Sequence, residues 1–381
     1  MKNGIKNVNI VTPEGVIKNG FLVYEDGIIT YVGQQEQEVS SLIDGKGGYL
    51  FPGFIDLHCH GGMGADFMDA TEEEMDVIAN GHAAHGTTTM LATILTASPQ
   101  ETRQALDTFA AYQANHPDSR YAGVHIEGPW FNPLQCGAQD TNNMKKPDPE
   151  ELKELKERYP FILRISAAPE LEQGDVVGKV GTELGILMSA GHTDANFHEI
   201  EQAYENGYIL MTHLYSGMKG VTRKNAFRIA GAVEGALYLD DMYVELITDG
   251  RHLPAELLRF VYKIKGPDKI CLITDAIRAG GMPNGTESIL GSRQNGTPVI
   301  VEDEVAKLLS RESFAGSVAT YDRVFRTMAE ATGASAVDMM KMSAQVPAKL
   351  LGLSDRGEIA VGKRADLVLM DSEYQIQKVI Y

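Results

Sequence analysis

The amino-acid sequence predicts an α/β fold: a (β/α)8 TIM-type barrel with a small β-sandwich domain formed by both termini. Two observations predict the barrel. Apolar strand-like runs alternate with helix-compatible segments through the middle of the chain, and polar residues follow the ends of most of these runs. A third observation predicts the small domain, because short strands punctuated by glycine occur at both ends of the chain.

The middle of the chain contains eight apolar runs with the length of buried strands. The segments between them are compatible with helices. Thr71–His85 opens with the capping pattern Thr71-x-x-Glu74, and Pro149–Arg158 is a second example. A doubly wound sheet is the alternative, but it would not usually collect polar residues from most of its strands. The predicted strands are Tyr49–Leu57, Thr87–Leu95, Tyr121–Glu127, Phe161–Ala167, Ile186–Gly191, Tyr208–His213, Met242–Thr248 and Lys269–Thr274.

The two ends of the chain have a different character from its middle. Residues 354–381 read as short strands joined by glycine turns, and so do residues 1–50. Short edge strands need partners, so we expect the two ends to pair into one small β-domain around a barrel of residues 51–353. The predicted N-terminal strands are Val8–Val11, Gly20–Tyr24 and Ile28–Val32.

The charge balance argues against two classes of partner. Lys and Arg total 34 and Asp and Glu total 52, which gives a net charge of −18. An acidic protein repels nucleic acid and anionic membranes, whereas a small anionic substrate can still be bound by a local arginine. The three cysteines are not closely paired, and no apolar run approaches the ~18 residues of a membrane span. We therefore expect a cytoplasmic protein.

His58-Cys59-His60 follows the first predicted barrel strand. Side chains alternate along a strand, so the two imidazoles point the same way and Cys59 points the other way. A barrel presents metal ligands at its mouth in this manner. Taken alone, the pair could equally be two unconnected histidines in a polar turn.

Comparable residues follow five further predicted strands, and in a barrel these ends converge on one cavity. Histidine together with carboxylate suits Zn²⁺ or Fe²⁺. We do not expect Cys59, Cys136 or Cys271 to be ligands. His125 shares a strand face with Glu127 and is either a residue that supports the ligands or a structural one. The strand-end residues are Glu127, His192, His213, Asp249 with His252, and Asp275.

The order of these motifs resembles the amidohydrolase superfamily, in most members of which a lysine of the fourth strand bridges two metals. The fourth strand here has no lysine, and the motif His125-Ile-Glu127-Gly-Pro129 supplies a carboxylate instead. That combination resembles one family over nearly the whole chain, the N-acetylglucosamine-6-phosphate deacetylases. Other matching motifs are Pro52-Gly-Phe-Ile-Asp56, Gly86-Thr-Thr-Thr89, Ser189-Ala-Gly-His192-Thr, Thr212-His213-Leu-Tyr, Thr274-Asp275-Ala276 and Ala315-Gly-Ser317.

The resemblance implies one or two divalent metal ions per chain, a homodimer or higher homo-oligomer, and Asp275 as the catalytic acid and base. The main metal ligands that it implies are Glu127, His192 and His213, with His58 and His60 supplying a second metal site. The implied contacts with a phosphorylated amino sugar are Ala138, Gln139, Ser216, Gly217, Arg228, Asp249, His252, Phe314, Ala315 and Gly316.

The chain departs from the family pattern at the sugar and phosphate end. Gln139 stands where many members have histidine, and Ser216-Gly217 stands where the family usually has Asn-Ala. The family's phosphate arginine lies in Arg-x-Pro-Gly. Arg228-Ile-Ala-Gly231 fits that spacing without the proline, and Arg223 is the alternative.

The activity that the resemblance implies is metal-dependent hydrolysis of N-acetyl-D-glucosamine 6-phosphate to D-glucosamine 6-phosphate and acetate. Asp275 would move the proton from water to the amine, and His252 would hydrogen-bond the oxyanion or the sugar. Another N-acetyl hexosamine 6-phosphate, such as the galactosamine derivative, or another amide stays open as the substrate. A metal-stabilised scaffold without catalysis is the alternative from another class, and Asp275 beside a full ligand set argues against it.

Overall fold

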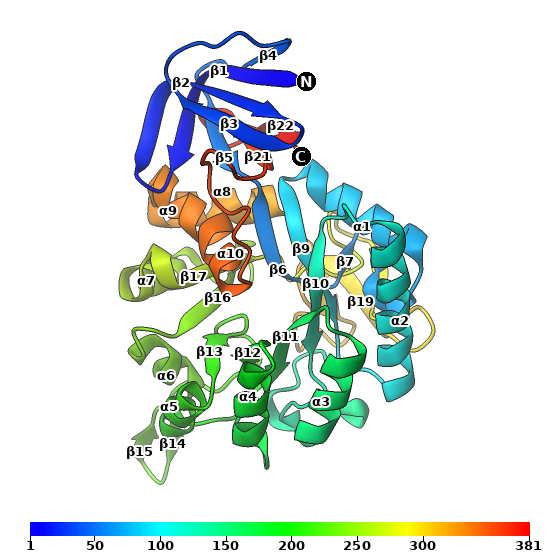
Figure 1. Cartoon of the computed structure of the whole chain (residues 1–381). Coiled ribbons are helices and arrows are strands. Elements are labelled where there is room, and N and C mark those ends of the chain that lie inside the picture. The colour runs from blue at the N-terminus through cyan, green and yellow to red at the C-terminus, as the bar shows by residue number, and fades with distance from the viewer.

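The computed structural model describes all 381 residues, and its largest element is a sheet of eight parallel strands surrounded by helices (Figure 1). The last strand returns to the first, where Cys59 pairs with Ala276 and the Asp275 N–H donates to the His58 carbonyl over 2.9 Å. The predicted barrel is confirmed. In spatial order its strands are β6 (Phe54–Cys59), β9 (Thr87–Ile94), β10 (Tyr121–Glu127), β11 (Ile162–Ala167), β12 (Leu187–Ala190), β13 (Tyr208–Met211), β16 (Tyr243–Ile247) and β17 (Ile270–Ile273).

The barrel strands are buried on both faces, which explains why they read as continuous apolar runs. Their outer face packs against the helices. The first helix begins after Thr71, whose side chain caps it by accepting a hydrogen bond from Glu74 N–H over 3.2 Å. The helices are α1 (Glu72–Ala84), α2 (Pro99–Asn115), α3 (Pro149–Arg158), α4 (Gly174–Glu183), α5 (Phe197–Glu205), α6 (Ala232–Tyr238), α7 (Ala255–Lys265), α8 (Tyr321–Thr332), α9 (Ala336–Met340) and α10 (Val346–Leu350).

The single strand predicted over Tyr49–Leu57 is wrong, because the structure divides it into two strands. β5 (Tyr49–Pro52) belongs to the terminal sheet, and β6 begins the barrel at Phe54. Between them Gly53 donates to the Asp366 carbonyl over 2.7 Å. A side chain on Gly53 would collide with Thr88, so the chain changes sheets at a residue that only glycine fits.

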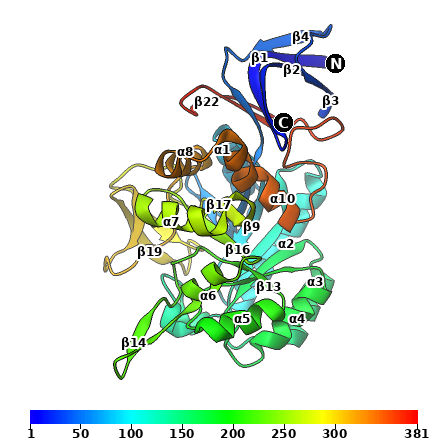
Figure 2. The same cartoon turned by 90° about the vertical axis from the view of Figure 1, so that its left-hand side faces the viewer.

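Both termini lie in one small domain beside the barrel, at the top of Figures 1 and 2. Its sheet has the order β22-β21-β5-β1-β2-β3, with β4 paired to β1. The sheet curls so that Ile28 pairs with Arg364, which encloses a core that includes Ile5, Leu22 and Leu369. The predicted pairing of the two ends is confirmed. The strands are β1 (Lys2–Thr12), β2 (Gly15–Glu25), β3 (Ile28–Gly33), β4 (Ser41–Asp44), β21 (Leu367–Met370) and β22 (Ile376–Ile380).

Three small sheets were not predicted from the sequence, and the shortest pairs β7 (Gly61–Gly62) with β8 (Ala65–Asp66) directly after the first barrel strand. The hairpin of β14 (Thr222–Lys224) and β15 (Phe227–Ile229) projects from the end of the molecule opposite the terminal domain (Figures 1 and 2). The third sheet follows β17 and contributes residues to the barrel mouth; it consists of β18 (Glu287–Leu290), β19 (Thr297–Glu302) and β20 (Val305–Leu308). None of the helices combines the length and the apolar character needed to cross a lipid bilayer.

Candidate active site

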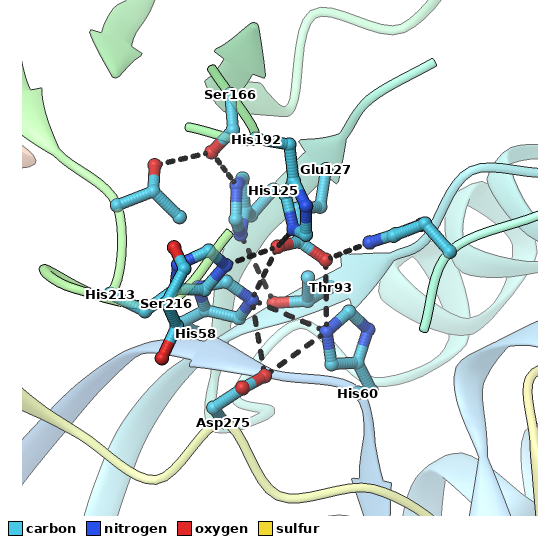
Figure 3. A network of polar contacts seen from close by, with 12 residues as sticks. His58, His60, Thr93, His125, Glu127, Ser166, His192, His213, Ser216 and Asp275 are labelled. Carbon is cyan, nitrogen blue, oxygen red and sulfur yellow. Dashed lines mark hydrogen bonds and ion pairs between the residues drawn. The ribbon is translucent and has the colours of Figure 1, made fainter. Parts of the chain in front are cut away.

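The polar residues predicted at the strand ends converge at the mouth of the barrel (Figure 3). Each follows or ends a different parallel strand, apart from the two histidines of β6, so the barrel itself brings them together. All of these side chains are almost completely buried. The cluster consists of His58 and His60 from β6, Glu127 from β10, His192 after β12, His213 after β13 and Asp275 after β17.

Glu127 lies at the centre of this cluster. Its Oε1 atom is 3.0 Å from His213 Nε2, 3.3 Å from His192 Nε2 and 3.4 Å from His58 Nε2. Its Oε2 atom is 3.2 Å from His60 Nε2. Two sets of ligand atoms, one with His58 and His60 and one with His192 and His213, therefore share this carboxylate, and within each set the atoms lie within 4.8 Å of one another.

The donor chemistry fits divalent metal. The Nε2 atoms of His58 and His60 face each other at 3.2 Å, an arrangement that a shared cation would satisfy. His192 Nδ1 lies 2.8 Å from the Gln135 carbonyl and His213 Nδ1 lies 3.1 Å from the Ser216 carbonyl. Donation from Nδ1 leaves Nε2 as the ligand atom of both rings.

Charge in the cluster also favours a cation. Burial lowers the pKa of His58, but the facing carboxylates of Glu127 and Asp275 outweigh it and raise the pKa to about 9. The same balance raises the pKa of His60 to about 10. Burial raises the pKa of Asp275, yet the two histidines hold it below its ordinary value. The two carboxylates thus attract positive charge to this site. Without a metal ion that charge is carried by protons on His58 and His60, and a metal ion that binds there would have to displace these protons.

Asp275 lies against the His58 and His60 half of the cluster. Its Oδ1 atom is 3.4 Å from His58 Nε2 and 3.3 Å from His60 Nε2. The backbone of Asp275 has a φ of 48°, and His192 and His213 have φ values of 45° and 28°. Three chemically important residues thus adopt the left-handed region, which is uncommon for residues other than glycine.

A cavity of about 370 Å³ opens over the cluster. Most of the substrate contacts expected from the sequence line it, namely Ala138, Gln139, Ser216, Gly217, His252, Phe314 and Gly316. Asp249 and Ala315 are buried behind this lining. Lining residues that the sequence did not indicate are Leu95, Gly137, Ile277, Leu290, Arg311, Glu312 and Ser313.

His252 is fixed from behind by Asp249. The Nδ1 atom of His252 lies 2.8 Å from Asp249 Oδ2, and the ring packs against Phe314 with centroids 5.0 Å apart. Burial lowers the pKa of His252, but Asp249 outweighs it and the net shift is upward. The Nε2 edge of His252 is thereby the part of the ring left to meet a ligand in the cavity.

Arg228 and Arg223 do not line the cavity of their own chain. Both are exposed and belong to the outward hairpin β14–β15, where residues 223 and 228 pair across the two strands. The long segment before Arg228 folds as this hairpin instead of leading back to the barrel mouth. The arginine that does line the cavity is Arg311, whose Nη2 atom lies 2.7 Å from Glu302 Oε1.

A polar layer lies beneath the cluster, and of its residues the sequence indicated only His125. The structure places His125 there: its Nε2 atom lies 2.7 Å from Ser166 Oγ, and its ring packs edge-on against His58 with centroids 4.7 Å apart (Figure 3). Arg164 and Glu245 form an ion pair in the same layer. The sequence does contain a signal for this ion pair, because Arg164 and Glu245 each stand as a charged residue in the middle of a largely apolar strand.

Comparisons with known proteins identify the family and agree with this fold. Residues 49–381 match the Amidohydrolase family. The chain is 33% identical over 383 residues to the N-acetylglucosamine-6-phosphate deacetylase of Lysinibacillus sphaericus, covering 99% of this chain and 95% of that protein. It is 30% identical to the N-acetylgalactosamine-6-phosphate deacetylase of Escherichia coli O157:H7, covering 100% of this chain and 98% of that protein.

Two solved structures are also similar. The N-acetylglucosamine-6-phosphate deacetylase of Thermotoga maritima has a TM-score of 0.88 at 32% identity, covering 99% of this chain and 97% of that one. A mutant of the Mycobacterium smegmatis deacetylase in complex with N-acetyl-D-glucosamine-6-phosphate has a TM-score of 0.90 at 28% identity, covering 100% of this chain and 97% of that one.

Proposed function

The chain belongs to the amidohydrolase family, and from this premise we propose that it hydrolyses the acetamide of N-acetyl-D-glucosamine 6-phosphate to D-glucosamine 6-phosphate and acetate. The observation that carries the proposal is the position of Asp275 beside two ligand sets that share Glu127, at the base of a cavity. A metal-stabilised scaffold would not require a carboxylate next to a complete ligand set.

We propose one or two divalent ions per chain, Zn²⁺ or Fe²⁺. Glu127, His192 and His213 would hold one ion, and His58 with His60 would hold a second beside the same carboxylate. Metal bound there would supply Lewis acidity, which activates water and polarises an amide carbonyl.

Asp275 is the proposed proton carrier. Its carboxylate is ionised at neutral pH, because the neighbouring histidines lower its pKa despite burial. It would accept the proton of a water that attacks the acetamide carbon, and it would deliver that proton to the nitrogen as the carbon–nitrogen bond breaks. The products are then acetate and the free amine. His252, held by Asp249, is positioned to hydrogen-bond the oxyanion or the sugar.

The phosphate is the least constrained part of the proposed substrate. Arg228 remains our proposed phosphate contact, but it lies on an exposed hairpin and does not line the cavity of its own chain. It would reach a bound phosphate only if a second copy of the chain brought its hairpin to this cavity, and we propose such a homo-oligomer. Within one chain Arg311 is the cation available at the cavity.

N-Acetyl-D-galactosamine 6-phosphate is the alternative substrate, since the Escherichia coli relative named for that activity is similar over the whole chain. The deciding experiment measures acetate release by metal-loaded protein from both phosphorylated sugars and from N-acetyl-D-glucosamine without phosphate. We expect the highest kcat/KM with N-acetyl-D-glucosamine 6-phosphate. If neither phosphorylated sugar releases acetate at confirmed metal occupancy, the proposal is contradicted.

A further inference from the structure

An ion pair lies inside the barrel directly beneath the metal cluster. Arg164 on β11 and Glu245 on β16 are both 0% exposed. The guanidinium meets the carboxylate twice, with Nη2 at 2.8 Å from Oε2 and Nη1 on Oε1. Burying two charges is unfavourable unless every donor and acceptor finds a partner, so a pair in this place calls for an explanation.

Arg164 uses all of its donors, and its partners lie beside the metal ligands. Nη1 also donates to the Leu57 carbonyl over 3.0 Å, and Leu57 directly precedes His58. Nη2 donates to Thr212 Oγ1 over 3.2 Å, and Thr212 directly precedes His213. Nε donates to Ser189 Oγ over 3.2 Å. One side chain thus connects the three strands β6, β12 and β13 from which ligand histidines emerge.

Glu245 reaches the ligands themselves. Its Oε2 atom lies 3.2 Å from the backbone nitrogen of His213 and 3.5 Å from Nδ1 of His58. His192 and His213 have backbone carbonyls as partners for Nδ1, and the Nδ1 atom of His60 has no partner. Glu245 is therefore the one carboxylate that meets the Nδ1 side of a ligand histidine in this cluster.

We propose that Arg164 and Glu245 are positioning residues for His58. Arg164 fixes the Glu245 carboxylate, and Glu245 accepts a hydrogen bond from His58 Nδ1–H, which directs His58 Nε2 toward Glu127. This inference rests on the metal site of the proposed function. Carboxylates that orient ligand histidines typically change metal affinity by roughly 10–100-fold when removed.

A purely structural pair would behave differently. It would support the barrel as a whole and would not distinguish the His58 and His60 ligand set from the His192 and His213 set. The positioning role predicts a selective loss of the ion held by His58 and His60. The distinction can be measured as metal binding, without any use of activity.

Two double variants form a matched comparison. Arg164→Met/Glu245→Leu replaces the pair by apolar groups, and Arg164→Met/Glu245→Gln instead places a neutral amide at residue 245, whose oxygen can accept from His58. Neither leaves a buried charge unpaired. A third variant, Glu245→Asp, keeps the charge facing Arg164 and withdraws the acceptor from His58; it decides the question if the leucine variant does not fold.

The full-length protein is stripped of metal and titrated with Zn²⁺ against a chelator. We expect the parent to bind two ions, and the leucine and aspartate variants to bind one ion normally and the other at least tenfold more weakly. The glutamine variant keeps the acceptor for His58 but loses the Arg164 that fixes it, so its second ion should bind more tightly than in the leucine variant and more weakly than in the parent. His58→Ala supplies the reference for loss of that ion. Equal binding of both ions by the leucine and glutamine variants would overturn the inference.

One further outcome separates the two proposals. A parent that binds a single ion, unaffected by His58→Ala, would also overturn the inference. Acetate release by that same parent would leave the proposed function intact.

Discussion

The side-chain amide of Gln139 is held at both ends, and one end holds Glu127. Its Nε2 atom donates to Glu127 Oε2 over 2.6 Å, while its Oε1 atom accepts from the Thr96 N–H over 2.9 Å. The bond from Thr96 fixes the orientation of the amide, so Nε2 faces the shared carboxylate. Gln139 thereby restrains the residue on which both ligand sets depend.

We expect Gln139→Leu to lower kcat/KM by roughly 10–100-fold, because Glu127 loses the partner that fixes its orientation. The measurement is steady-state acetate release together with metal content. Leu134→Ala is the matched control, since Leu134 lies in the same loop but is 77% exposed and does not line the cavity. Parent-like kinetics in both variants would show that Glu127 does not depend on this amide.

Asp275→Asn should reduce kcat by roughly 10²–10⁴-fold while the fold and the metal content persist, because an amide cannot accept the proton of the attacking water. The test is turnover at saturating substrate with metal occupancy measured on the same sample. Asp44→Asn, far away in the terminal sheet, controls for the loss of a carboxylate. Turnover within a few fold of the parent would remove Asp275 from the mechanism.

Metal binding should release protons near neutral pH. In the metal-free protein the pKa of His58 is about 9 and that of His60 is about 10, so both rings are protonated at pH 7. A ligand imidazole must be neutral, so apparent metal affinity should rise as pH increases toward these values. Calorimetry in two buffers of different ionisation enthalpy counts the protons released. His58→Ala/His60→Ala should release fewer, and an unchanged count would contradict the assignment.

The phosphate contact can be assigned by comparing Arg228→Ala with Arg311→Ala. If a second copy supplies Arg228, that variant should raise KM for the phosphorylated sugar far more than for the unphosphorylated one, because losing a charge-assisted bidentate pair costs about 2–4 kcal/mol of binding free energy. Sedimentation should show an oligomer under the same conditions. A monomer, with KM raised only by Arg311→Ala, would place the phosphate on Arg311 of the same chain.

Local sequence patterns were enough to predict most barrel strands. Tyr121–Glu127 and Pro149–Arg158 have the predicted bounds, because an apolar run or a capped amphipathic segment is a local property. The division of Tyr49–Leu57 was not predictable in this way. It depends on Thr88 and Asp366 lying against Gly53, and these contacts exist only after the chain has folded.

The site shows the same limit. The cluster followed from residues placed at strand ends, where barrel geometry leaves little freedom. The pairing of Arg164 with Glu245 depends on which strands face each other across a closed barrel, so two buried charges alone did not reveal it. Arg228 was assigned by its spacing to Gly231, and spacing carries no information about a hairpin that turns outward.

The left-handed backbone at His192, His213 and Asp275 has a consequence for how this protein responds to selection. Each such conformation costs on the order of 1–3 kcal/mol for a residue with a side chain. Glycine or asparagine would adopt the same backbone with less strain, so His192→Gly or His213→Asn should relieve strain in the metal-free protein as it abolishes the ligand. A screen for heat resistance of the metal-free protein would not select against the loss of these residues, so engineering for thermal robustness should leave these three positions fixed.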